Sequence, residues 1–302
     1  MPMRPDHIRI VEVGPRDGLQ NEAQPLSPQE RVDLIQQLAA AGLKDIEAGS
    51  FVSPRWVPQM AGSDEVLESL SGRLDLRLPV LVPNKKGYKN ARAAGAREIA
   101  IFGAASETFS QRNINCSIDE SLGRFAEVCA LAKDDGVVIR GYISCVLGCP
   151  YEGKVEIAQV ASLAAKLIAM GCSEISLGDT IGVGTPDKAR ALAKACASET
   201  GIDNLSVHFH DTYGQALANI LACIEIGVNT VDTAVGGLGG CPYASGSAGN
   251  VATEDVVYMM EGLGIDCATD LDQLVTITDS LSRRLGHPPA SRVARAQLAK
   301  RH

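Results

Sequence analysis

The stretch Ser206-Val207-His208-Phe209-His210-Asp211-Thr212-Tyr213-Gly214 is typical of a β-strand that ends and leads into a helix. Side chains alternate between the two faces of a strand, so His208 and His210 leave the same face. Two imidazoles placed in this way can bind one divalent metal ion. Two core histidines that hydrogen-bond their neighbours are the structural alternative. Asp211 and Thr212 precede a helical run and can accept hydrogen bonds from its unpaired N–H groups.

Short runs rich in β-branched residues alternate with longer helical patterns along the whole chain. The predicted strands cover residues 8–13, 45–48, 77–82, 98–102, 137–145, 174–177, 205–210 and 230–235. The predicted helices cover residues 27–41, 63–70, 86–94, 118–135, 155–170, 186–200, 214–226 and 253–263. Such strict alternation is typical of a parallel α/β sheet. Eight strand–helix units in roughly 260 residues predict a closed (β/α)8 TIM barrel rather than an open doubly wound sheet.

The domain organisation follows from the absence of any linker, low-complexity tract or break in composition. We expect a single TIM-barrel catalytic domain over residues 1–302, with the barrel over about 8–265. The tail over about 266–302 is expected to add one or two C-terminal helices that cap the barrel or form a dimer contact.

Composition excludes several classes of function. The chain is 45% hydrophobic and 21% charged, as in ordinary globular proteins, and its net charge of −8 argues against nucleic acid or an anionic membrane as partner. No apolar run approaches the roughly 18–20 residues of a membrane span. The ends show neither a signal peptide nor a peroxisomal tripeptide. Nine cysteines without Cys-x-x-Cys spacing indicate reduced thiols, so we expect a cytoplasmic protein.

A TIM barrel places its functional residues at the carboxyl ends of its strands and in the loops that follow them. In this chain the residues at these places are Arg16, Asp17, Glu47, Asp179, His208, His210, Cys241 and Asn250. Stability alone does not require charged or metal-binding residues at so many strand ends. The pattern therefore predicts a functional site.

The turn Gly14-Pro15-Arg16-Asp17-Gly18-Leu19-Gln20 follows the first predicted strand. Asp17 could be an oxygen ligand of a metal and Arg16 could bind an oxyanion, or the two could form a structural ion pair. An aspartate, two histidines and a neutral amide would make a mixed nitrogen and oxygen set for a divalent ion with open positions. This set contains no cysteine, which argues against structural zinc. Glu47 ends an apolar strand, where an unpaired carboxylate is costly, so Arg16 is its expected partner.

The segment over residues 235–243 is rich in glycine and carries Cys241. It lacks the Gly-Lys-Ser/Thr ending of a P-loop and the register of a dinucleotide-binding fingerprint. A mobile loop that brings a reactive thiol over the barrel mouth is the functional interpretation, whereas a lone cysteine is usually a small buried hydrophobic residue. Asn250 either caps the next helix or adds its carbonyl oxygen to a metal shell.

These segments together closely resemble the 3-hydroxy-3-methylglutaryl-CoA lyase family of the DRE-TIM metallolyases. The resemblance rests on residues 11–22, 50–60, 207–218, 236–250 and 252–255. The Gly-Gly-Cys-Pro-Tyr-Ala loop is typical of the lyase branch, whereas the Arg-Asp-Gly element is shared with Claisen-type synthases.

The resemblance implies a retro-Claisen cleavage of 3-hydroxy-3-methylglutaryl-CoA to acetyl-CoA and acetoacetate, as in leucine degradation and ketone-body formation. It implies Mg²⁺ or Mn²⁺ as the cofactor, an acyl-CoA as the small-molecule partner and a homodimer as the assembly. The implied metal ligands are Asp17, His208, His210 and Asn250. The implied catalytic residues are Arg16 for the enolate, Glu47 as its support, Cys241 as the thiol, and Asp17 and His208 beside the ion. The implied substrate contacts are Arg16, Gln20 and Asp179, and the general base stays open between Asp17 and His210.

Other functions of the same barrel remain as alternatives. A related 3-hydroxyacyl-CoA lyase would differ only in its acyl group. A Claisen-type synthase would condense acetyl-CoA with a 2-oxo acid and would normally carry a long regulatory extension after the barrel. A non-catalytic metal-binding scaffold would not need the arginine, the acidic partners and the thiol. Lys85, Lys86 and Lys89 are available cations for CoA, although lysines at a helix start are usually solvated.

Overall fold

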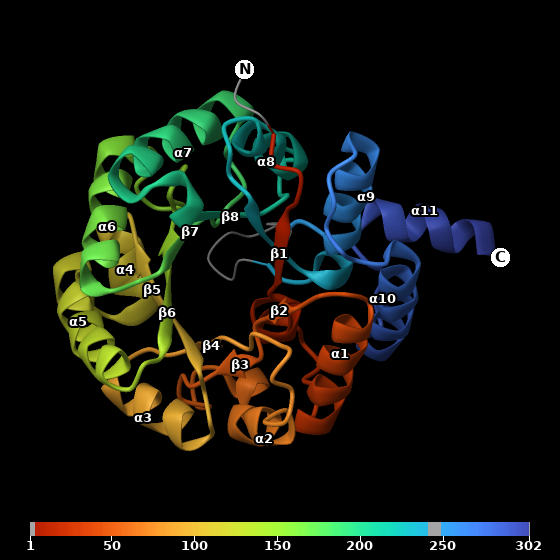
Figure 1. The fold of residues 1–302 in the computed structure, drawn as a ribbon, viewed down its shortest axis with the longest axis horizontal. Coiled ribbons are helices and arrows are strands. Elements are labelled where there is room, and N and C mark those ends of the chain that lie inside the picture. Colours follow the sequence, from red (N-terminus) through yellow and green to blue (C-terminus); the bar gives the residue numbers. More distant parts are fainter. Residues whose placement is uncertain (1–3, 241–248, 302) are drawn as a thin grey trace.

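The strands form one parallel sheet that curls into a barrel, with helices around its outside (Figure 1). The computed structural model describes residues 4–240 and 249–301. Neighbouring strands follow the order β2-β1-β9-β8-β7-β6-β5-β4-β3. Their bounds are β1 Arg9–Glu12, β2 Asp45–Ile46, β3 Gly49–Ser50, β4 Val80–Leu81, β5 Glu98–Ala104, β6 Val138–Ser144, β7 Glu174–Asp179, β8 Leu205–Phe209 and β9 Thr230–Thr233.

The barrel closes through β2 and β3, which are two halves of one extended segment. Only Glu47 and Ala48 separate them, and β2 pairs with β1 while β3 pairs with β4. Between the halves, the Glu47 N–H donates to the Glu12 carbonyl at 2.9 Å and the Ala48 N–H donates to the Pro79 carbonyl at 3.0 Å. The nine strand segments therefore occupy eight barrel positions. The TIM-barrel prediction is confirmed.

The helices lie between successive strands and cover the outer face of the sheet (Figure 1). Their bounds are α1 Pro28–Ala40, α2 Ser63–Ser69, α3 Lys85–Ala93, α4 Glu107–Ile114, α5 Ile118–Asp134, α6 Ile157–Met170, α7 Pro186–Thr200, α8 Ala216–Ile224, α9 Thr253–Leu263, α10 Leu271–Leu285 and α11 Arg292–Arg301. Within residues 4–240 and 249–301, every helix is too short or too polar to span a bilayer.

Helix α1 shows how local sequence sets these bounds. The Ser27 hydroxyl accepts from the Glu30 N–H while the Glu30 carboxylate accepts from the Ser27 N–H, which is a capping box. Gly42 follows the helix with a φ of +107°, and a Cβ there would lie 2.0 Å from the Ala268 carbonyl oxygen. Both a left-handed backbone and close packing therefore require glycine at this position.

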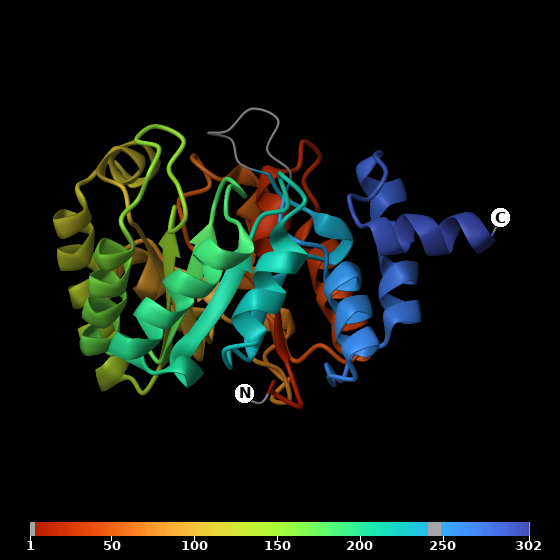
Figure 2. The ribbon, with the colours of Figure 1, turned by 90° about the horizontal axis from the view of Figure 1, so that it is seen from above.

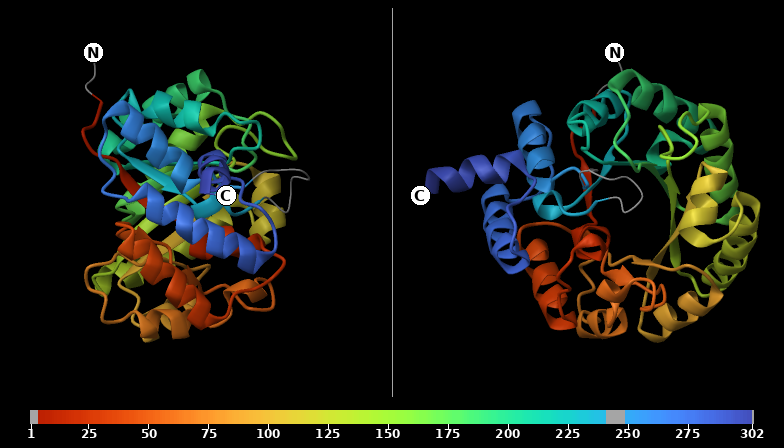
Figure 3. Two further views of the ribbon diagram at one scale, coloured as in Figure 1. Left: turned by 90° about the vertical axis from the view of Figure 1, so that its right-hand side faces the viewer. Right: turned by 180° about the vertical axis from the view of Figure 1, so that it is seen from behind.

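The chain beyond the barrel forms two helices, as expected for the tail. α10 packs against α1 and α9. α11 extends away from the barrel, as Figures 2 and 3 show. Of its residues, Ala294 is fully buried. The tail thus caps one side of the barrel and presents a projecting helix.

The amino-terminal half of the barrel interior is filled by a chain of ion pairs, which we call the floor. It consists of Arg9, Asp45, Arg77, Glu98, Arg140, Glu174 and Asp232. Arg140 Nε lies 2.6 Å from Glu174 Oε1, and Arg140 Nη2 lies 2.5 Å from Asp232 Oδ1. TIM-barrel interiors are usually filled by branched apolar side chains. Here the main apolar core lies instead between the strands and the helices.

Candidate active site

Three metal-competent side chains meet at the carboxyl end of the barrel. Asp17 lies in a π-helical turn, Gly14–Gly18, directly after β1, while His208 belongs to β8 and His210 follows it. One ligand atom from each residue lies within 4.8 Å of the others. The two imidazole centroids are 5.4 Å apart. The prediction that both histidines leave one face is confirmed, and together with Asp17 they form a possible metal site.

The protonation of these side chains suits a cation. Burial, with a smaller contribution from His208, lowers the pKa of His210 to about 4, so its imidazole is neutral. Burial alone would raise the pKa of Asp17, but Arg16 and the two histidines outweigh it and lower the value to about 2. His210 Nδ1 is buried without a hydrogen-bond partner among the described residues. A carboxylate and a neutral imidazole with a free nitrogen fit a divalent metal ion.

Asp232, which sequence analysis missed, orients the first histidine. Its Oδ2 lies 3.3 Å from His208 Nδ1 and accepts from the Ser176 hydroxyl at 2.8 Å. Burial lowers the pKa of His208, but the bond to Asp232 and the charge of Asp17 more than compensate and raise it. A carboxylate on one ring nitrogen fixes the tautomer and leaves Nε2 facing Asp17. The signal available in the sequence was a lone charged residue in the strand predicted over 230–235.

Arg16 is held as a fixed cation at the edge of the metal site. Its Nε lies 2.7 Å from Glu47 Oε2 and its Nη1 lies 2.7 Å from Asp17 Oδ1. Burial would lower the pKa of Arg16, but the charges of Glu47 and Asp17 outweigh it and raise the pKa. The expected Arg16–Glu47 pair is confirmed. Glu47 Oε1 keeps no hydrogen-bond partner among the described residues.

Two further buried carboxylates hold the turns that carry the site. Glu12 accepts from the N–H groups of Gly14 and Val235 at 2.7 and 2.9 Å. Glu254 accepts from the N–H of Gly236 at 3.0 Å. These bonds tie the turn after β1 to the loop after β9 and to α9. Neither glutamate was predicted, because hydrogen bonds from backbone N–H groups to a side chain leave no residue pattern in a sequence.

Asn250 lies beside Asp17 and does not cap a helix. Its Nδ2 donates to Asp17 Oδ2 at 2.9 Å and to the Leu238 carbonyl at 3.1 Å. The residue that precedes α9 is Ala252, so the capping alternative is wrong. A role for Asn250 as a metal ligand stays a prediction. In contrast, Asp211 does satisfy an N–H group at the start of α8, since its Oδ1 accepts from the Ala216 N–H at 3.0 Å, although the N-cap position itself is Gln215.

A cavity of about 1190 Å³ opens above these residues. The predicted residues that line it are Arg16, Asp17, Gln20, His208 and His210. Asp179 is fully buried outside this lining, and its carboxylate accepts from the N–H groups of Val183 and Gly184 at 3.2 and 2.7 Å. The predicted substrate contact through Asp179 stays a prediction, as does that through Gln20. Cys241 lies outside the described residues.

The side of the cavity that faces the metal site is apolar, and we call it the apolar wall. It consists of Val52, Leu81, Phe102 and Tyr142, which pack together apart from the main core. The Tyr142 centroid lies 5.7 Å from Arg16 Cζ and 6.0 Å from the His208 ring. At the mouth lie two exposed arginines that sequence analysis missed, Arg112 on α4 and Arg124 on α5. The cavity thus combines a polar wall, an apolar wall and a cationic mouth.

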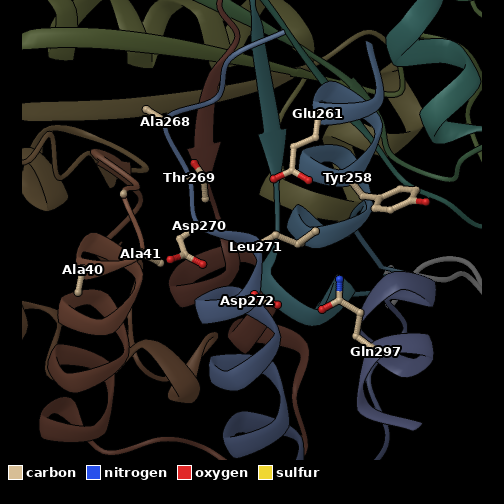
Figure 4. Close-up of a pocket in the computed structure, with 11 residues that line it drawn as sticks. Ala40, Ala41, Tyr258, Glu261, Ala268, Thr269, Asp270, Leu271, Asp272 and Gln297 are labelled. Atoms are coloured by element: carbon tan, nitrogen blue, oxygen red, sulfur yellow. The ribbon is translucent and has the colours of Figure 1, made fainter. Parts of the chain in front are cut away.

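A second hollow of about 800 Å³ lies outside the barrel, between the ends of α1, α9, α10 and α11 (Figure 4). Its lining includes Tyr258, Glu261, Asp270, Asp272 and Gln297. None of the predicted site residues that the structure describes lines it. The chemistry of the chain therefore belongs to the cavity at the strand ends.

Known proteins resemble this chain over nearly its whole length. The family model described as HMGL-like matches residues 7–281. A relative named hydroxymethylglutaryl-CoA lyase, mitochondrial, from Bos taurus is 54% identical and covers 97% of this chain and 90% of its own length. The 3-hydroxy-3-isohexenylglutaryl-CoA/hydroxymethylglutaryl-CoA lyase of Pseudomonas aeruginosa is 54% identical, with coverage of 98% and 99%. A crystal structure of hydroxymethylglutaryl-CoA lyase from Pseudomonas aeruginosa superposes with a TM-score of 0.95 at 54% identity, with coverage of 98% and 99%.

Proposed function

The chain belongs to the HMGL-like family, and from this premise we propose that it cleaves 3-hydroxy-3-methylglutaryl-CoA into acetyl-CoA and acetoacetate. It is a carbon–carbon lyase, as its close relatives are. One observation carries the proposal: Asp17, His208 and His210 converge beside the buried cation of Arg16 in one cavity. A retro-Claisen cleavage needs both a Lewis acid at the hydroxyl and a positive charge at the thioester.

The proposed cofactor is Mg²⁺ or Mn²⁺, held by Asp17, His208 and His210, with Asn250 as a further ligand. When bound, it would supply Lewis acidity to the 3-hydroxyl oxygen of the substrate. Support comes from His210 Nδ1, which has no hydrogen-bond partner among residues 4–240 and 249–301, and from the ionised Asp17; together they offer both kinds of ligand such an ion accepts.

The cleavage involves two proton transfers and the movement of one electron pair. A base takes the proton of the 3-hydroxyl; Asp17 and His210 are the candidates next to that oxygen. The C2–C3 bond breaks, C3 becomes the ketone carbon of acetoacetate, and the electron pair enters the thioester as an enolate. Arg16 donates hydrogen bonds to the enolate oxygen, and Glu47 holds its guanidinium in place. The enolate takes a proton at C2, for which we propose the thiol of Cys241.

The substrate's CoA arm would leave through the mouth of the cavity. Arg112 and Arg124 lie there, and guanidinium groups pair well with phosphate oxygens. This arrangement supports an acyl-CoA as the partner of the site.

The proposed setting is a homodimer in the cytoplasm. The eight cysteines among the described residues are free thiols, which suits a reducing compartment. The projecting helix α11 offers a surface for a second copy. Size-exclusion chromatography with light scattering would test the dimer.

The decisive experiment uses metal-stripped protein with 3-hydroxy-3-methylglutaryl-CoA and follows acetoacetate with and without Mg²⁺ or Mn²⁺. Acetoacetate that forms only with metal would support the lyase and its cofactor together. Loss of activity in Cys241→Ala would then connect the thiol to the reaction. A protein that binds the metal but releases no acetoacetate would contradict the proposal and redirect the search to other 3-hydroxyacyl-CoA thioesters.

A further inference from the structure

The two sides of the active-site cavity differ in chemistry. The polar wall, formed by Arg16, Asp17, His208 and His210, comes from the ends of β1 and β8. The apolar wall comes from β4, β5 and β6 together with Val52. A substrate that binds across this cavity must therefore turn its polar groups to one side and an apolar group to the other.

The substrate of the proposed function has such a group. Its C3 carries a hydroxyl, a carboxymethyl arm, a thioester arm and a methyl. In the proposed function the hydroxyl lies at the metal site and the thioester lies at Arg16. The carboxylate is disfavoured at the apolar wall, because it would lose its hydration there without gaining a hydrogen bond. Because C3 is tetrahedral, the methyl points away from these three polar groups. The methyl group therefore points toward the apolar wall.

Phe102 is the largest purely apolar side chain of this wall. It faces the cavity from β5, in register with Tyr142 on β6. Phe125 of α5 is 1% exposed, also lines the cavity and packs against Phe102 with ring centroids 6.0 Å apart. The Phe125 ring therefore limits the movement of Phe102 toward α5. A group placed on the wall meets an aromatic ring that is packed against a second one.

We propose that Phe102, with Leu81 beside it, limits the size of the substituent that the site accepts at C3 of a 3-hydroxyglutaryl thioester. The proposal rests on the proposed lyase function and adds its determinant of acyl-group specificity. A methyl fits between the polar groups and the wall. A longer alkyl chain meets the Phe102 ring and displaces C3 from the metal site and Arg16.

The test compares two substrates that differ only at C3, one with methyl and one with n-pentyl. Release of acetyl-CoA, which both reactions share, gives kcat/KM for the wild type, Phe102→Ala, Phe102→Leu and Leu81→Ala. We expect Phe102→Ala to raise the pentyl-to-methyl ratio of kcat/KM by about tenfold or more, since a few methylene groups in a pocket commonly decide this much. Phe102→Leu and Leu81→Ala should give smaller rises.

Ile101→Ala is the matched control. Ile101 is the preceding residue on β5, is fully buried in the main core and faces the helices. Its truncation loosens the same strand without enlarging the cavity, so the substrate ratio should stay at the wild-type value. Mn²⁺ affinity and the melting temperature report whether each variant keeps its site and fold.

Three outcomes would overturn the proposal. Folded Phe102→Leu and Leu81→Ala proteins with normal Mn²⁺ affinity and an unchanged ratio would remove the wall as the determinant. An equal rise in Ile101→Ala would assign the effect to general loosening. A wild type that cleaves neither thioester would end the lyase proposal and this inference together, whereas cleavage with an unchanged ratio ends only the inference.

Discussion

Two groups of charged side chains share the inside of one barrel and are organised in opposite ways. In the floor, each charge has at least one opposite partner, and each of its three arginines has two. At the carboxyl end, Glu47 Oε1 and His210 Nδ1 are buried without partners among the described residues, and three ligand atoms converge. A buried network whose members satisfy one another needs nothing further, whereas one with unsatisfied atoms is ready for a ligand.

Asp232 belongs to both groups. It binds Arg140 of the floor and His208 of the metal site. The floor serves stability and the residues at the carboxyl end serve the site, but the Asp232 carboxylate joins the two groups. Substitutions in the floor, in the group at the carboxyl end and at Asp232 test how far stability and function depend on separate residues.

The largest effect is expected on stability, from Arg140→Met in the floor. The substitution leaves Glu174 and Asp232 buried without their shared cation, which should lower the free energy of unfolding by about 3–5 kcal/mol. Urea denaturation measures the change. Arg283→Met, at an exposed arginine of α10, is the control and should have little effect. Equal stability of the Arg140→Met and Arg283→Met proteins would refute a structural role for the floor.

Arg16→Gln tests only the group of charged residues at the carboxyl end of the barrel. The variant removes the fixed cation that we propose binds the enolate oxygen, and it should reduce kcat by about 10³-fold. Calorimetric titration with Mn²⁺ should show the metal affinity retained, since Asp17 and both histidines remain. A normal kcat in this variant would show that Arg16 does not stabilise the enolate.

Asp232→Asn tests the link between the floor and the residues at the carboxyl end of the barrel. An amide supports the His208 ring less well than a carboxylate, so Mn²⁺ affinity should fall by about 10- to 100-fold. Ser176→Ala removes a different hydrogen bond of Asp232 and leaves the bond to His208, so it is the matched control. Unchanged Mn²⁺ affinity in Asp232→Asn would mean that metal binding at the carboxyl end does not depend on the residue shared with the floor.

The smallest effect comes from an ion pair outside the barrel. His287 donates from Nε2 to Glu22 at 2.8 Å and from Nδ1 to the Pro288 carbonyl at 3.1 Å. The carbonyl and the carboxylate raise the pKa of His287 above its ordinary 6.5. Its contribution to stability is therefore complete below pH 6.5 and is lost as the pH rises through the folded-state value.

The side chains of this pair are partly exposed, so the contribution should not exceed about 1 kcal/mol. Urea denaturation of the wild type and His287→Gln should show a difference at pH 6 that disappears by pH 8.5. A difference that stays constant with pH would exclude the titration of His287 as its cause.

Most of the fold was accessible from the sequence because hydrophobic periodicity and helix caps are local signals. The helix predicted over 186–200 matches α7, and the one over 253–263 matches α9. α4 was missed because it is short and lies inside the loop after β5. The single strand predicted over 45–48 is divided in the structure at Glu47, where backbone pairing passes from β1 to the segment before β4.

The candidate site was accessible only in part. His208 and His210 could be identified because residues two positions apart in one strand lie on the same face. Asp232 and Glu12 do not, because their roles depend on contacts between strands far apart in the chain. The placement of Asp179 against its own loop was missed for a different reason: its donors, Val183 and Gly184, follow it closely, but bonds to backbone N–H groups leave no distinctive motif.

The floor also decides how molecules pass through the barrel. Because ion pairs occupy the amino-terminal half of the barrel, we expect the cavity to open only at the carboxyl ends of the strands. If the CoA arm lies in that opening as proposed, acetyl-CoA should depart before the smaller ketoacid beneath it. Acetoacetate should then inhibit competitively against the thioester substrate and acetyl-CoA noncompetitively, and the reverse pattern would require a second exit.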